Sequence, residues 1–172
     1  MDGSARSNLG LSGGGGACRN ENGNLIFAFS IGYGAGSNNQ AELRAIHDDI
    51  AMCLEKRLSK IEVESDSKVM VDLLLGKSNI AWSWRPWVSR ILNLVSRGTS
   101  FKLIKREGNG PANGLACDGS KRQSFSLYNH MSDLPTEVRG MIFLERVGLG
   151  CLIKTFSSHS YAILLALLGN SL

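Results

Sequence analysis

The sequence predicts an α/β protein in which helices flank a mixed β-sheet, and three observations support this class. Two strand-like runs, Gly13–Arg19 and Leu25–Ile31, are separated by turn-forming residues, which is typical of a β-hairpin. Between Gln40 and Leu58 the large apolar residues recur every three or four positions, which indicates an amphipathic helix. A short apolar run, Ile61–Glu64, then predicts a strand that a crossover connection would place parallel in the sheet.

The elements follow one another with recognisable boundaries. Asn38 or Asn39 is a suitable N-cap for the long helix. Gly76 is a natural end for the helix that follows the third strand, and Pro86 can begin the next one. The remaining predicted elements are a helix Val69–Leu75, a helix Pro86–Arg97, a strand Phe101–Lys105, a helix from about Ala112 and a helical rhythm over Asp133–Leu149. Gly150–Leu172 shows no coherent amphipathic pattern.

Composition limits the class of protein more than its function. The chain has 172 residues, of which 43% are hydrophobic and 20% charged, so it can form a core and is not disordered by composition. The net charge of +4 permits an anionic partner such as nucleic acid. Residues 2–15 contain only Leu9 and Leu11 as large apolar residues, so we expect no signal peptide, and the longest apolar run, Tyr161–Leu168, is too short to cross a bilayer. We expect an intracellular protein, nuclear or cytoplasmic, with buried free cysteines and no membrane contact.

Four segments place polar residues where strands end or helices begin. They are Asp2–Ser4, Asn39–Ala45, Glu64–Ser67 and Arg106–Ala116. In this order they resemble the type 1 ribonuclease H domain, and more closely the plant reverse-transcriptase-like group of retroelement-derived proteins. The resemblance covers about residues 2–120. It implies a ribonuclease H-like domain over residues 1–120 with a central mixed five-stranded sheet, followed by a partly helical, weakly ordered extension over residues 121–172.

The resemblance also implies a metal-dependent active site. Asp2, Glu42 and Asp66 match the first three acidic positions of the family, and Asn113 takes the place of the fourth acid. We expect these four residues to be catalytic and the three carboxylates to bind Mg²⁺, or Mn²⁺, which prefers oxygen ligands. Two such ions would activate a water molecule and stabilise the leaving oxygen at a phosphodiester. The implied partner is an RNA–DNA hybrid, whose RNA strand would be hydrolysed by a monomeric domain.

Two departures from the family pattern predict weakened activity. An amide at Asn113 removes one negative charge from the implied metal site. Only Met1 precedes Asp2, so the first strand of the sheet is expected to be truncated, as in a remnant of a retroelement. A central strand that lacks its beginning would leave backbone groups unpaired.

The stretch from Gly76 to Arg106 is the candidate nucleic-acid surface, because it holds seven basic residues, no acidic ones and all three tryptophans. Asn38, Asn39 and Gln40 match amides that contact the minor groove of the hybrid in related domains. The other candidate contacts are Trp82, Trp84, Arg85, Lys105 and Arg106. The competing interpretation is that the tryptophans pack a helix onto the sheet and that the charges are a solvated face.

Each carboxylate also has an ordinary explanation. Asp2 can be a solvated terminal acid, Glu42 a surface residue of its helix, and Asp66 an N-cap. Three functional hypotheses therefore remain open: a hybrid ribonuclease, a nucleic-acid-binding module without turnover, and a fragment that does not fold alone.

Overall fold

The computed structural model describes residues 10–95, 98–146 and the backbone of residues 161–168. The strands are β1 (Gly10–Arg19), β2 (Leu25–Gly36), β3 (Ile61–Ser65), β4 (Thr99–Leu103), β5 (Phe125–Tyr128) and β6 (Tyr161–Leu168). The α-helices are α1 (Asn38–Glu55), α2 (Lys68–Leu74), α3 (Arg85–Leu94), α4 (Gly110–Arg122) and α5 (Thr136–Arg146). Three short 3₁₀ turns are η1 (Trp82–Trp84), η2 (Arg106–Asn109) and η3 (Met131–Asp133).

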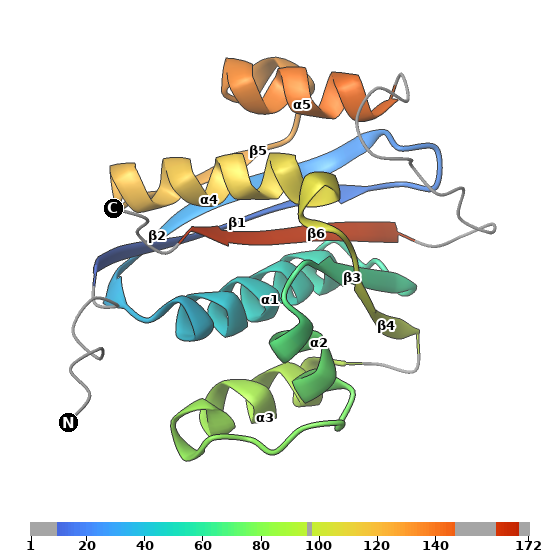
Figure 1. Cartoon of the computed structure of the whole chain (residues 1–172). Helices are drawn as coiled ribbons and strands as arrows, with labels where there is room; N and C mark the ends of the chain where they lie inside the picture. Colours follow the sequence, from blue (N-terminus) through green and yellow to red (C-terminus); the bar gives the residue numbers. More distant parts are fainter. Residues whose placement is uncertain (1–9, 96–97, 147–160, 169–172) are drawn as a thin grey trace.

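The strands form one mixed sheet in the order β4-β3-β6-β1-β2-β5. β1 and β2 form the predicted antiparallel hairpin, and β5 adds to the outer edge of β2. β3 and β4 are parallel, as the crossover through α2 and α3 requires. β6 lies between β1 and β3, antiparallel to the first and parallel to the second (Figure 1). The mixed sheet flanked by helices is therefore confirmed, with six strands rather than the expected five.

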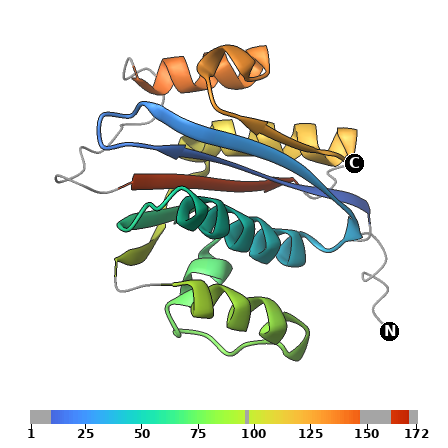
Figure 2. The same cartoon turned by 180° about the vertical axis from the view of Figure 1, so that it is seen from behind.

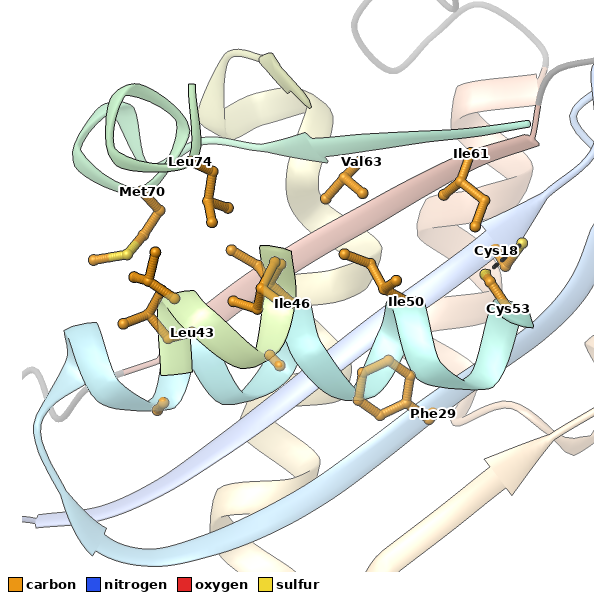
Figure 3. Packing of buried hydrophobic residues seen from close by; sticks show 14 of the residues in the cluster. Cys18, Phe29, Leu43, Ile46, Ile50, Cys53, Ile61, Val63, Met70 and Leu74 are labelled. Carbon is orange, nitrogen blue, oxygen red and sulfur yellow. Dashed lines mark hydrogen bonds between the residues drawn. The ribbon is translucent and has the colours of Figure 1, made fainter. Parts of the chain in front are cut away.

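Helices cover both faces of the sheet. α1 packs on one face with α2 and α3 beyond it, and α4 and α5 lie on the other face, as the view from behind also shows (Figure 2). The larger core fills the α1 side and joins side chains from both halves of the sheet, including Phe29, Leu43, Ile50 and Val63 (Figure 3). In the described part of the chain, none of the helices combines the length and apolarity needed to cross a membrane.

The glycine run of β1 allows close packing, which agrees with its assignment to a hairpin strand. A Cβ on Gly15 would lie 2.4 Å from the backbone nitrogen of Ala116 in α4. On the opposite face, a Cβ on Gly14 would lie 2.6 Å from the ring of Tyr33. The absence of side chains here lets helix and sheet backbones approach closely.

Helix boundaries follow local capping. The N-cap of α1 is Ser37, one residue before the predicted Asn38 or Asn39, and its side chain accepts a hydrogen bond from the backbone nitrogen of Gln40. The N-cap of α2 is Ser67 rather than Asp66, so the capping explanation for Asp66 is wrong. Gly76 follows the end of α2 with a φ of 70°, the left-handed conformation that favours glycine.

The region after Ser120 contributes to the same sheet. β5 extends one edge, and α5 packs against α4 through Val138 and Ile142. A buried ion pair joins α5 to β1, because Arg19 Nη1 lies 2.6 Å from Glu145 Oε2. β6 falls in the stretch without an amphipathic pattern. A strand paired on both edges, in a sheet covered on both faces, needs no polar alternation, so periodicity does not reveal it.

Two features of the core depart from ordinary apolar packing. Cys18 and Cys53 are fully buried free thiols with their sulfur atoms 3.8 Å apart, as expected, whereas Cys117 is free but only partly buried. Asp49 is 0% exposed, and neither carboxylate oxygen has a hydrogen-bond partner among the described residues. Burial, with smaller contributions from Cys53 and Asp48, raises the pKa of Asp49 well above its ordinary value. At neutral pH, Asp49 is therefore either protonated or, if it is ionised, lowers the stability of the folded protein.

Candidate active site at the carboxyl end of strand β3

Asp66 follows the last residue of β3 and directly precedes the N-cap of α2. The backbone nitrogen of Ser67 donates a hydrogen bond to Ser65 Oγ at 3.1 Å, which shapes the turn around Asp66. The side chain is partly buried. A carboxylate at the carboxyl end of a parallel strand is well placed to face a ligand, because ligands bind at this edge of open α/β sheets.

Glu42 of α1 lies close enough to Asp66 for their charges to interact. Burial raises the pKa of Glu42 to about 7, a hydrogen bond with Ser67 opposes this increase, and the charge of Asp66 adds to it. One carboxylate oxygen, Oε2, is buried and has no hydrogen-bond partner in the described structure. The two acids that the sequence predicted as neighbours are therefore brought together from α1 and the end of β3.

Asn109 is a site residue that the sequence analysis did not single out. It ends η2 and is 0% exposed, and its Nδ2 donates a hydrogen bond of 2.7 Å to Asp66 Oδ1. This contact orients the Asp66 carboxylate. A signal was available, since Asn109 is a polar residue within the motif Arg106–Ala116 and lies one helical turn before Asn113.

Asn113 lies in the first turns of α4 and is partly buried. Within the described residues, no hydrogen bond connects its side chain to Glu42 or Asp66. Asp2 lies outside the described residues. The described part of the chain contains no cluster of three acidic, histidine or cysteine side chains that could hold a metal ion. The site that can be described thus consists of two carboxylates, Glu42 and Asp66, and the amide of Asn109.

The candidate nucleic-acid contacts occupy two places. Asn38, Asn39 and Gln40 are partly buried in the first turn of α1, two to four residues before Glu42. Trp82 is 84% exposed, whereas Trp84 is partly buried against the main core. The other candidates, Arg85, Lys105 and Arg106, are exposed.

A group of stacked cationic and aromatic side chains attaches α3 to the rest of the molecule, and sequence reasoning missed it. The Arg44 guanidinium lies 4.0 Å from the ring centre of Tyr33 and 5.7 Å from that of Trp87. Arg90 lies over the same Trp87 ring at 4.9 Å. Tyr33 donates a hydrogen bond of 2.8 Å from its hydroxyl to Asp48. Trp87 therefore serves packing, as the competing interpretation of the tryptophans held, while Arg90 adds positive charge to the exposed side of α3.

The mixed sheet with helices on both faces is similar to the ribonuclease H fold, as solved structures show. The ribonuclease H1 of Halobacterium salinarum is similar with a TM-score of 0.65 and 23% identity, covering 70% of this chain and 94% of that one. LC11-RNase H1, solved in complex with an RNA/DNA hybrid, is similar with a TM-score of 0.60 and 27% identity, covering 70% of this chain and 94% of that one.

Sequence comparison identifies the family within this fold. The reverse transcriptase-like family matches residues 1–119, so the chain belongs to that family and contains a ribonuclease H-like domain. An Arabidopsis thaliana protein named for ribonuclease H is 30% identical over an alignment of 158 positions that covers 84% of this chain. The chain spans 23% of the length of that relative.

Proposed function

We propose that this domain binds RNA–DNA hybrids and hydrolyses the RNA strand with the help of a divalent cation, at a rate reduced by the neutral side chain of Asn113. The observation that carries the proposal is the convergence of Glu42, Asp66 and Asn109 at the end of β3. The solved complex of LC11-RNase H1 with an RNA/DNA hybrid supports the choice of substrate class. Arg85 is exposed, and together with other basic residues of the stretch from Gly76 to Arg106 it would neutralise phosphates whatever the base sequence of the nucleic acid.

The donor groups fit a divalent cation. Glu42 offers a buried oxygen without a hydrogen-bond partner, and a buried carboxylate in this state is stabilised by a positive charge. Asp66 offers a second carboxylate, which the hydrogen bond from Asn109 holds in place. Glu42 and Asp66 would hold Mg²⁺, which would neutralise charge at the scissile phosphate and increase the acidity of a water molecule there. Replacing an acid by Asn113 lowers the negative charge available for this purpose.

A second function, binding without turnover, is favoured by one specific observation. β6 lies beside β3 at the site and carries no acidic residue in its sequence, so no further carboxylate comes from that strand. If the charge of the site is too low to hold the cation, the basic surface would remain as a hybrid-binding module.

Cleavage of a labelled RNA–DNA hybrid, with Mg²⁺ or Mn²⁺, distinguishes the two functions. We expect slow cleavage by the natural chain, loss of at least about 100-fold with Asp66→Asn, and a gain of at least about tenfold with Asn113→Asp. Asp133→Asn, which makes the same charge change at an exposed residue of η3, is the matched control and should leave the rate unchanged.

Binding of the same hybrid in EDTA is measured for every variant, with circular dichroism to verify folding. Hybrid binding without cleavage by the natural chain and by Asn113→Asp would favour the binding module. Equal cleavage rates for the natural chain and Asn113→Asp would contradict the role assigned to the missing charge.

A further inference from the structure

The centre of the sheet is completed by the last strand of the chain. β6 pairs antiparallel with β1 from Gly13↔Leu168 to Arg19↔Ala162. On its other edge it pairs parallel with β3 from Ile61↔Tyr161 to Ser65↔Leu165. β6 is therefore hydrogen-bonded on both sides by strands that lie far away in the sequence (Figure 1).

The pairing with β6 is what joins the two halves of the sheet. In the described strand order, β1-β2-β5 form one half and β3-β4 the other, and β1 does not pair with β3. Without β6, β1 and β3 would each have a row of unpaired backbone groups, and the space between them would be a slot as wide as one strand.

The body around this slot has packing of its own. The core on the α1 side joins Phe29 of β2, Ile50 of α1 and Val63 of β3, so α1 also contacts both halves directly. On the other face, α4 lies against the glycines of β1 at backbone distance. Withdrawal of β6 would therefore open an acceptor slot in a body in which α1 still contacts both halves of the sheet.

The chemistry of the slot and of the strand allows exchange. The β1 edge that receives β6 includes Gly13–Gly16, so recognition there depends on backbone hydrogen bonds rather than on specific side chains. The sequence of β6 has no charged residue and no proline, the features that natural edge strands use to prevent unwanted pairing. β6 is also the last element of the described residues.

We propose that Tyr161–Leu168 is an exchangeable strand, and that two copies of this chain form a dimer in which each copy completes the sheet of the other. The strand–slot contacts are identical within one chain and between two chains, so protein concentration decides which form predominates. β3 is paired with β6 up to Ser65, the residue before Asp66. In the dimer, the strand that pairs with β3 beside each candidate active site would therefore come from the second copy. The exchange does not depend on whether the site cleaves RNA.

The unmodified chain of 172 residues provides the first test. Light scattering after size-exclusion chromatography, from about 10 μM to about 1 mM protein, should show monomer and dimer. At low occupancy, the dimer-to-monomer ratio should increase about tenfold for each tenfold increase in free monomer. A chain that remains monomeric throughout this range would overturn the proposal.

Disulfide cross-links then identify the strand that joins the copies. Ala17→Cys with Leu164→Cys, and native Cys18 with Ile163→Cys, are adjacent register pairs between β1 and β6. Adjacent antiparallel pairs alternate between closer and wider spacing, so one of the two is suited to a disulfide. Each of the two cysteine pairs is made in a chain whose other cysteines have been replaced. Ala17→Cys with Ala28→Cys, across the hairpin that is not exchanged, is the matched control.

After oxidation with excess oxidised glutathione, which is reduced as each disulfide forms, the separated fractions are run on non-reducing gels. We expect β1–β6 cross-links to give covalent dimers from the dimer fraction and internally cross-linked monomers from the monomer fraction. The hairpin control should give internal cross-links from both fractions. Internal β1–β6 cross-links in the dimer fraction would overturn the proposal, because the copies would then meet elsewhere. Absence of a β1–β6 cross-link from folded protein would also overturn it.

Discussion

Replacement of Glu42 by glutamine should stabilise the protein at pH 8 and have much less effect at pH 5. Glu42 is partly buried beside Asp66, and these surroundings raise its pKa from 4.5 to about 7. The folded state therefore binds more protons than the unfolded state between these two values. Stability attributable to Glu42 is fully present below pH 4.5 and is lost as the pH rises through about 7. Glutamine has nearly the same shape and no charge to lose.

The magnitude follows from the same two pKa values. Each tenfold change in proton affinity corresponds to about 1.4 kcal/mol, so the ionised Glu42 reduces the free energy of unfolding by at most about 3 kcal/mol above pH 8. About 2 kcal/mol of this loss falls between pH 5 and pH 8. The advantage of Glu42→Gln over the natural chain should increase by that amount across this interval.

Urea unfolding at pH 5 and pH 8, in EDTA to exclude divalent cations, measures this difference. Glu55→Gln is the matched control, since Glu55 is exposed at the end of the same helix and should show no such increase. An advantage of Glu42→Gln that stays constant between the two pH values would refute the reasoning. Under the proposed function, Mg²⁺ should stabilise the natural chain at pH 8 and leave Glu42→Gln unchanged.

Three further predictions concern stability at pH 7, measured by denaturant unfolding. Asp49→Ala should stabilise the protein by about 1–3 kcal/mol, because it removes a fully buried carboxyl without a hydrogen-bond partner in the described structure. A lower stability of Asp49→Ala would mean that Asp49 makes a necessary contact. Arg19→Met should cost about 3–5 kcal/mol by leaving Glu145 buried and unpaired, and replacing both residues by apolar ones should cost much less. Gly15→Ala should destabilise by about 1–3 kcal/mol, since its Cβ would meet the α4 backbone at 2.4 Å. Gly140→Ala, an exposed helical position with nothing within 4 Å of the added Cβ, should instead gain about 1 kcal/mol.

Local sequence signals predicted most elements on the N-terminal side of Ser120. The hairpin and α1 were predictable because turn residues and apolar periodicity act over a few neighbouring residues. Their boundaries shifted by a few residues where capping decided them, as at Ser37 and Ser67. Gly76, by contrast, followed directly from the need for a left-handed residue after α2.

For the candidate site, the motif order predicted that Glu42 and Asp66 would meet, and the structure brings them together from α1 and the end of β3. Neither the hydrogen bond from Asn109 nor the stacking of Arg44 and Arg90 around Trp87 could be read from spacing. The first contact joins residues more than 40 positions apart and the second joins two different helices, so only the folded chain defines them.

The sequence by itself determined the fold class, the family resemblance and the identity of two acids, because these depend on residue type, local periodicity and motif order. The tertiary structure decided how the sheet is completed. The apolar stretch Tyr161–Leu168 lacks periodicity, and its two partners, β1 and β3, are set by which backbone edges remain unpaired after the rest of the chain has packed. Strand pairing over such separations is a property of the whole sheet, and no local pattern encodes it.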